Sequence, residues 1–182
     1  MNNNSTKKLI FSAIGIAINI VLGMVVGLLH IPLLFMDTVG TIFIAVICGP
    51  IYGAAVGGIT NLVLGVLKDP REIPFLLVNV AIGLIVGFIA KNRKFDIKTA
   101  VITGLILAVV APLIGTPIAV YVYGGITGDV NDIFFVWLKN SGMEIFSSAF
   151  IPRITSNIVD KVISCVLVSI CYARLKGVIK ND

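Results

Sequence analysis

Amide and charged side chains lie inside several long apolar segments of this sequence. An ionisable or amide group costs free energy in such surroundings, so it usually marks a binding site or a contact between helices. The hydrogen bonding and ion pairing that these groups offer suit recognition of a small polar ligand. The candidate ligand-binding residues of this kind are Asp37, Asn61, Asn79, Arg153, Asn157 and Lys161.

The last apolar segment carries the densest group of polar residues. Arg153, Asn157, Asp160 and Lys161 follow the spacing i, i+4, i+7 and i+8, which places them on one broad face of a helix. A face in contact with lipid would be apolar, so this stripe is predicted to line a cavity, with Asn157 touching the ligand. Lys161 is expected either at the floor of that cavity or paired with an acid.

A purely structural reading of the same residues stays open. Asp160 and Lys161 would then only hold helices together. A single asparagine within a span, such as Asn79, more often joins helices than binds a ligand.

The sequence lacks the motifs of the common catalytic classes. It has no G-x-x-x-x-G-K-[ST] loop for a nucleotide, and no pairing of a nucleophile with a base stands out. A single histidine rules out a histidine-based metal cluster, and the three cysteines are interpreted as small apolar residues. We therefore expect no enzyme, no metal and no cofactor, and an ATP-driven process would need a separate ATPase chain.

Composition assigns the chain to the membrane proteins. Hydrophobic residues make up 58% and charged residues 13% of 182 residues, and the mean hydropathy is +1.07. A soluble domain has about 45–50% apolar and about 25% charged residues. A chain of this size cannot bury such an excess inside itself, because much of its surface stays exposed.

The apolar segments predict six membrane-spanning helices in a single domain covering residues 1–182. A span needs about 20 apolar residues, and the long run after residue 32 is divided at Gly49–Pro50 because proline disfavours helix at the preceding residue. The fold class expected is an all-α integral membrane bundle. The six ranges are 9–29, 33–48, 51–67, 74–90, 99–123 and 152–173.

Basic residues predict the orientation of this bundle. With six spans, one face holds Lys7, Lys8, Lys91, Arg93, Lys94, Lys98, Arg174, Lys176 and Lys180. The opposite face holds Lys68, Arg71, Lys139 and Arg153. Basic residues concentrate on the cytoplasmic side, so both termini are expected in the cytoplasm of a multi-pass protein of the cell membrane. The charge of +5 is then a topology signal, and nucleic acid is not an expected partner.

The depth of the polar residues within their predicted spans favours a ligand site open to the outside, and so do the residues of the outer loop. Asp37, Asn61 and Asn79 fall in the outer halves of their predicted spans, at about the level of the polar stripe. Residues 124–148 form the longest polar region, in which 133–138 is a candidate interfacial helix. Trp137 is either a headgroup anchor or a stacking platform for a flat heterocycle, and Asn140 and Glu144 would orient the ligand.

Small residues mark possible close-packing faces. Ala13 and Ala17 are four residues apart in the first span, and Gly53 and Gly57 have the same spacing in the third. Such faces let helices approach closely.

The sequence resembles the substrate-binding S components of energy-coupling factor (ECF) vitamin transporters. The resemblance rests on the segment SAIGIAI with Ala13 and Ala17, on residues 35–65 and on residues 123–164. It implies a six-helix fold, a pocket near the outer face and a gating loop between the first two helices. It also implies that Ala13 and Ala17 dock onto a transmembrane coupling subunit, driven by two cytoplasmic ATPase subunits, to import a vitamin or similar micronutrient.

A self-sufficient secondary carrier or channel is the competing class. A secondary carrier favours inverted repeats and a midplane site with broken helices, and neither pattern is convincing here. The candidate site contains acids and bases in near balance, so its composition favours neither a cationic nor an anionic substrate.

Overall fold

The computed structural model describes residues 3–29, 31–128 and 131–179. Within these ranges the chain forms seven α-helices and one 3-10 turn and no strand, which confirms the all-α prediction. The elements are α1 (Asn3–Leu28), α2 (Val39–Cys48), α3 (Pro50–Leu67), η1 (Pro70–Glu72), α4 (Leu76–Asn92), α5 (Ile97–Tyr123), α6 (Asn131–Asn140) and α7 (Ile145–Ile179).

Three of the described helices are long and apolar enough to cross a membrane by length and composition: α1 from Ser5, α3 and α5. Two further apolar helices, α2 and α4, are shorter, with 10 and 17 residues. The longest helix, α7, has 35 residues and carries Arg153, Asp160 and Lys161. The count of six spans therefore stays a prediction.

The predicted helix 33–48 begins six residues later than expected, at Val39. Leu33 and Met36 both have positive φ angles, 64° and 55°, which a right-handed helix does not allow. Ten residues at 1.5 Å each make α2 only about 15 Å long, half of the hydrocarbon core. The first turns of the predicted helix therefore belong to a loop. This loop, residues 31–38, is here called the α1–α2 loop.

The region between α5 and α7 is more helical than predicted. Residues 133–138 belong to α6, which covers the whole of Asn131–Asn140, and α7 begins seven residues before the predicted start at Pro152. Because α7 begins earlier, Pro152 lies inside this helix and not in its first turn.

Glycines set the closest helix contacts. A Cβ atom on Gly57 of α3 would lie 2.6 Å from the backbone oxygen of Asn79 in α4, and one on Gly83 would meet the backbone of Gly53 and Ala54. Gly104 of α5 lies equally close to α7, where a Cβ would be 2.7 Å from the Cα of Val162. In the described residues α3 therefore packs tightly on α4 and α5 on α7, and α2 packs as closely on α1, where a Cβ on Gly40 would meet the backbone of Gly15.

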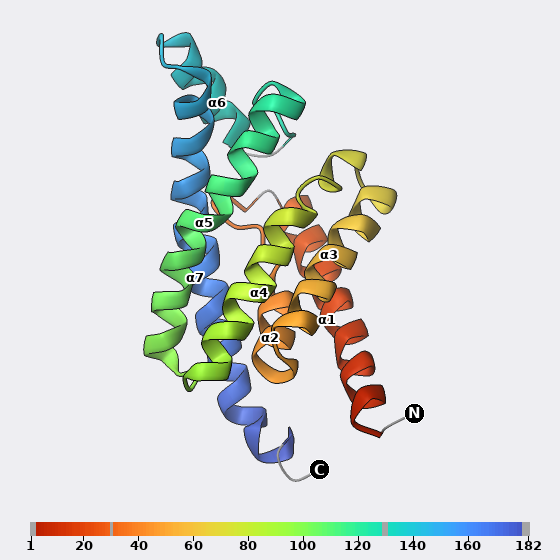
Figure 1. The fold of residues 1–182 in the computed structure, drawn as a ribbon. Helices are drawn as coiled ribbons and strands as arrows, with labels where there is room; N and C mark the ends of the chain where they lie inside the picture. The colour runs from red at the N-terminus through yellow and green to blue at the C-terminus, as the bar shows by residue number, and fades with distance from the viewer. Residues whose placement is uncertain (1–2, 30, 129–130, 180–182) are drawn as a thin grey trace.

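Figure 1 shows how these helices are arranged along the bundle. The first turn of α1, the connection between α4 and α5 and the last turns of α7 lie at one end. The α3–α4 connection and α6 lie towards the other end. The expected cytoplasmic location of the first end stays a prediction, since the fold fixes no membrane side.

Candidate functional site

The α1–α2 loop is bound to α7 through the carboxylate of Asp160. The Oδ1 atom of Asp160 accepts hydrogen bonds from the backbone N–H groups of Phe35 and Met36, both at 2.9 Å. Asp160 is completely buried. Two backbone donors aimed at one carboxylate oxygen make a charge-assisted contact stronger than a bond between neutral groups, so the loop has a defined anchor on α7.

Lys161 binds the same loop from the next position on α7. Its ammonium group lies 2.6 Å from Oδ2 of Asp160 and 3.1 Å from the hydroxyl oxygen of Thr38, and Asp37 is 3.8 Å away. Of the two positions that the sequence left open for Lys161, the structure has the pairing with an acid. Two carboxylates surround one ammonium, so this group of three carries a net charge of −1 when all are ionised.

Asp37 lies in the α1–α2 loop and not within a helix, which corrects the predicted position just inside a span. Its Oδ1 atom is buried and accepts no hydrogen bond from the described residues, while the side chain as a whole is 29% exposed. A buried carboxylate oxygen without a hydrogen bond is costly. Asp37 is therefore the acid in this group with acceptor capacity left for a ligand.

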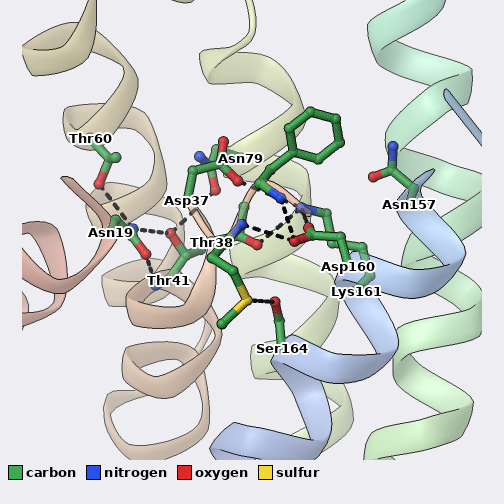
Figure 2. A network of polar contacts seen from close by, with 12 residues as sticks. Asn19, Asp37, Thr38, Thr41, Thr60, Asn79, Asn157, Asp160, Lys161 and Ser164 are labelled. Atoms are coloured by element: carbon green, nitrogen blue, oxygen red, sulfur yellow. Dashed lines mark hydrogen bonds and ion pairs between the residues drawn. The ribbon is translucent and has the colours of Figure 1, made fainter. Parts of the chain in front are cut away.

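A second polar network joins α1, α2, α3 and α4 beside the loop (Figure 2). Asn19 donates to the hydroxyl oxygens of Thr41 and Thr60 at 2.9 and 3.0 Å, and its Oδ1 accepts from the backbone N–H of Gly40 at 2.7 Å. Thr41 in turn donates to Oδ1 of Asn79 at 3.2 Å. Asn19, Thr41 and Thr60 are completely buried, so the network holds four helices together.

Asn61 and Asn79, both predicted to bind substrate, bond to each other in this network. The amide of Asn79 donates to Oδ1 of Asn61 at 2.7 Å, and the amide of Asn61 donates to the backbone oxygen of Glu72 at 3.1 Å. Both side chains are buried. Their geometry suits the joining of α3, α4 and η1, and a ligand role for them stays a prediction.

Asn157 stands apart from both groups in Figure 2, one turn before Lys161 on α7. Its amide donates to the backbone oxygen of Arg153 at 2.8 Å. Within the described residues its Oδ1 atom accepts no hydrogen bond, and the residue is half-buried. Among the polar residues of the α7 stripe, Asn157 thus keeps the acceptor that a ligand would need.

Arg153 is buried with neutral partners. Its guanidinium donates to the backbone oxygens of Ala149 and Gly125 at 2.9 and 3.4 Å and to the hydroxyl oxygen of Thr127 at 2.9 Å. It has no carboxylate within ion-pair distance in the described parts of the chain. Arg153 therefore ties the start of α7 to the connection after α5 and also places a buried positive charge one turn from Asn157.

The three candidates in and after α6 lie on the surface of the protein. Trp137 is 65% exposed on α6. Asn140 and Glu144 are exposed at the end of α6 and just before α7. No hydrogen bond among the described residues joins these side chains to Asp37, Asn157 or Lys161, so their predicted contact with substrate stays untested.

The partner-binding candidates lie on the outer surface of α1. Ala13 and Ala17 are exposed, whereas Gly15 and Asn19 on the other face of the helix are buried against α2. The exposed alanines thus leave a shallow, accessible face, which is the geometry that their predicted role needs.

Sequence reasoning omitted several residues that build the site. Asn19, Thr38, Thr41, Thr60 and Asp160 were not among the candidate ligand contacts, although all are buried and hydrogen bonded. The sequence could have indicated Asp160 as a site residue, since it belongs to the polar stripe of α7. It could not have indicated the threonines, because threonine is common in apolar helices and their hydrogen-bond partners are distant in the sequence.

Comparison with known proteins assigns the chain to a family. Residues 3–177 match the family described as "ECF-type riboflavin transporter, S component". The chain is 30% identical over 196 aligned residues to a UPF0397 protein of Streptococcus agalactiae serotype Ia, with 100% of both chains covered. UPF0397 proteins of serotypes V and III match equally well. No solved structure matches.

The chain belongs to the ECF-type riboflavin transporter S component family. The resemblance noted in the sequence is thereby confirmed over nearly its whole length. It is a membrane transport protein of a family of substrate-binding transporter subunits, and not of an enzyme family.

Proposed function

We propose that this chain captures a vitamin or a related small micronutrient at the outer face of the bacterial plasma membrane. It would deliver this substrate through a complex with a transmembrane coupling subunit and two cytoplasmic ATPase subunits. Six spans with both termini in the cytoplasm belong to the same proposal. Family membership supports the assignment of substrate binding to this chain and of ATP hydrolysis to separate subunits. The site geometry supports substrate binding beside the α1–α2 loop.

The observation that carries the proposal is the anchored α1–α2 loop beside open hydrogen-bonding groups. The loop is attached to α7 through Asp160 and Lys161. Beside this attachment lies Oδ1 of Asp37, which accepts no hydrogen bond from the described residues and is 3.8 Å from the ammonium of Lys161. One turn before Lys161 on α7 lies Oδ1 of Asn157, which also accepts none from the described residues. A ligand that donates hydrogen bonds to these two oxygens would supply the hydrogen bond that the buried Oδ1 atom of Asp37 lacks. The loop would then close over the ligand.

Each predicted contact has a defined part in this proposal. Asp37 and Asn157 accept hydrogen bonds from the substrate, Arg153 balances negative charge on it, and Lys161 positions Asp37. Asn61 and Asn79 support the site from the neighbouring network. Trp137, Asn140 and Glu144 contribute at the outer entrance, and Ala13 and Ala17 contact the coupling subunit.

Calorimetry on the purified chain tests this proposal. Riboflavin is the first ligand to titrate, because the family description names it, and other water-soluble vitamins follow. We expect one ligand per chain without ATP and without partner subunits. A chain that binds none of these compounds alone, but binds one only after assembly with the coupling subunits, would contradict the proposal.

A further inference from the structure

A cleft of about 410 Å³ lies at the end of the bundle where α4 connects to α5. Its walls are the end of α4 with the α4–α5 connection, the last turn of α2 at Val46, and Tyr172 and Ala173 in the C-terminal part of α7. Three cationic residues line it, Lys91, Arg93 and Lys94, together with the phenol of Tyr172. The cleft is far along α7 from Asp160 and belongs to no part of the site described above.

The cations of this cleft have no ionic partners in the described chain. Lys91, Arg93 and Lys94 are exposed, and none lies within ion-pair distance of a carboxylate. Asp96, the acid that also lines the cleft, caps α5 by accepting a 2.9 Å hydrogen bond from the backbone N–H of Thr99. This bond holds the pKa of Asp96 below its usual value. The charged groups of the cleft therefore sum to +2 at neutral pH, and an anion would be attracted.

The connection that carries these cations is held in place. Phe95 is buried, and its backbone oxygen accepts a 3.0 Å hydrogen bond from the hydroxyl of Ser169 on α7. The backbone N–H of Arg93 bonds to Ile89 at 2.9 Å and continues the end of α4. The backbone that carries the cations is thus fixed, so that only their side chains have to be ordered when they bind an anion.

The remaining wall of the cleft is apolar. Val46, Phe95 and Ala173 line it beside the cations, and the cleft lies at the ends of the apolar helices α4 and α5. The cleft thus has a cationic rim and an apolar wall at the end of the bundle. These two surfaces suit an amphiphile whose charged group and apolar chain lie at the membrane interface. A free inorganic anion would use only the rim.

We propose that this cleft binds the headgroup of an anionic phospholipid. The lipid phosphate would contact Lys91, Arg93 and Lys94, and the glycerol and the first acyl carbons would lie against the apolar wall. The proposal does not depend on the identity of the transported substrate. It adds a lipid site on the end of the bundle that carries most of the basic residues, where anionic lipid attracts Lys and Arg.

Native mass spectrometry of the purified full chain tests the lipid site. The chain is mixed with equal amounts of phosphatidylglycerol and phosphatidylcholine, and retained lipid is measured. We expect preferential retention of one phosphatidylglycerol. The triple variant Lys91→Gln/Arg93→Gln/Lys94→Gln should lose roughly 100-fold in affinity for it, from about 1 kcal/mol for each of the three basic residues near an anionic surface.

A matched control removes the same charge from cations that do not line the cleft. The variant Lys8→Gln/Lys98→Gln/Arg174→Gln changes three exposed cations at the same end of the bundle and should retain the lipid much better than the cleft variant does. Equal losses in both variants, or no preference for phosphatidylglycerol in the wild type, would overturn the proposal. Displacement of the lipid by millimolar inorganic phosphate alone would also overturn it, since the site would then be a simple anion site.

Discussion

The carboxylate of Asp160 lies 2.9 Å from the backbone nitrogen of Phe35, although 125 residues separate them in the sequence. The same oxygen accepts from Met36, so one buried side chain fixes two consecutive peptide groups of the α1–α2 loop. The positive φ of Met36 lies at this contact. The backbone conformation of Met36 is unfavourable for methionine, and it is maintained by the hydrogen bond that its N–H donates to Asp160 on α7.

Replacement of this anchor should release the loop. In Asp160→Asn the charge is lost, Lys161 keeps only the more distant carboxylate of Asp37 at 3.8 Å, and the two peptide donors retain a weaker acceptor. We expect a free energy of unfolding lower by about 1–3 kcal/mol, the usual effect of weakening hydrogen bonds to a buried charged group, because Asp37 still compensates Lys161. Hydrogen exchange of residues 33–38 should accelerate more than exchange in α3. Unchanged protection of residues 35 and 36 would show that Asp160 does not hold the loop.

A ligand role for Asn157 separates cleanly from a structural one. Asn157→Ala removes an acceptor that no described residue uses, so binding should weaken while the fold remains stable. Loss of a hydrogen bond to a buried ligand group is expected to cost about 1–3 kcal/mol, roughly 5- to 150-fold in Kd. Calorimetry gives the affinity, and thermal unfolding without ligand gives the stability. Wild-type affinity in a well-folded variant would remove Asn157 from the site.

The network around Asn19 should behave in the opposite way. Asn19→Ala removes the amide that donates to the hydroxyl oxygens of Thr41 and Thr60, and it leaves the buried N–H of Gly40 without its side-chain acceptor. We expect a loss of about 1–3 kcal/mol in stability, seen as a lower Tm with and without ligand. Asn79→Ala should resemble it. A variant of Asn79 that keeps the wild-type Tm but loses affinity would instead make Asn79 a ligand contact.

Close packing of α3 on α4 predicts a contrast between two glycines. Gly83→Ala would push a methyl group into the backbone of Gly53 and Ala54, so it should destabilise the protein, by about 1–3 kcal/mol as for other overpacked sites. Gly27→Ala meets no atom within 4 Å. It should be neutral or stabilising by up to about 1 kcal/mol, because alanine is the better helix former. Equal Tm values for both variants would contradict the packing described.

Much of this fold follows from the apolar segments, because lipid and core both demand continuous apolar helices. That requirement predicted α1, α3, α4 and α5 to within a few residues, apart from the polar first turn of α1. It failed at the start of α2, where Leu33 is apolar but adopts a left-handed backbone. The reason is tertiary, since the loop conformation depends on its bonds to Asp160.

The candidate site was predictable only in part for a similar reason. The spacing on α7 brought Arg153, Asn157 and Lys161 onto one face, and the structure has them there. The partners of these residues come from other helices, and nothing local in the sequence reports them. Asn61 and Asn79 illustrate the limit, since their type suggested a ligand while their geometry makes each the partner of the other.

Docking through α1 has its own test. Ala13→Trp or Ala17→Trp should block assembly with the coupling subunit and abolish transport, because a large ring would fill the accessible face of α1. Ligand binding by the isolated chain should stay normal. Val66→Trp places the same ring on an exposed position of α3 and serves as the control. Normal copurification of both alanine variants with the coupling subunit would exclude this face as the contact.

We propose above that this chain binds substrate by itself and transports it only together with a coupling subunit and two ATPase subunits. Uptake into proteoliposomes that contain the chain alone, or the chain with the coupling subunit and both ATPases, tests this most directly when binding is measured on the same preparations. We predict stoichiometric binding in both preparations, and ATP-dependent accumulation only in the second. Substrate accumulation by the chain alone would contradict the account and identify a self-sufficient carrier.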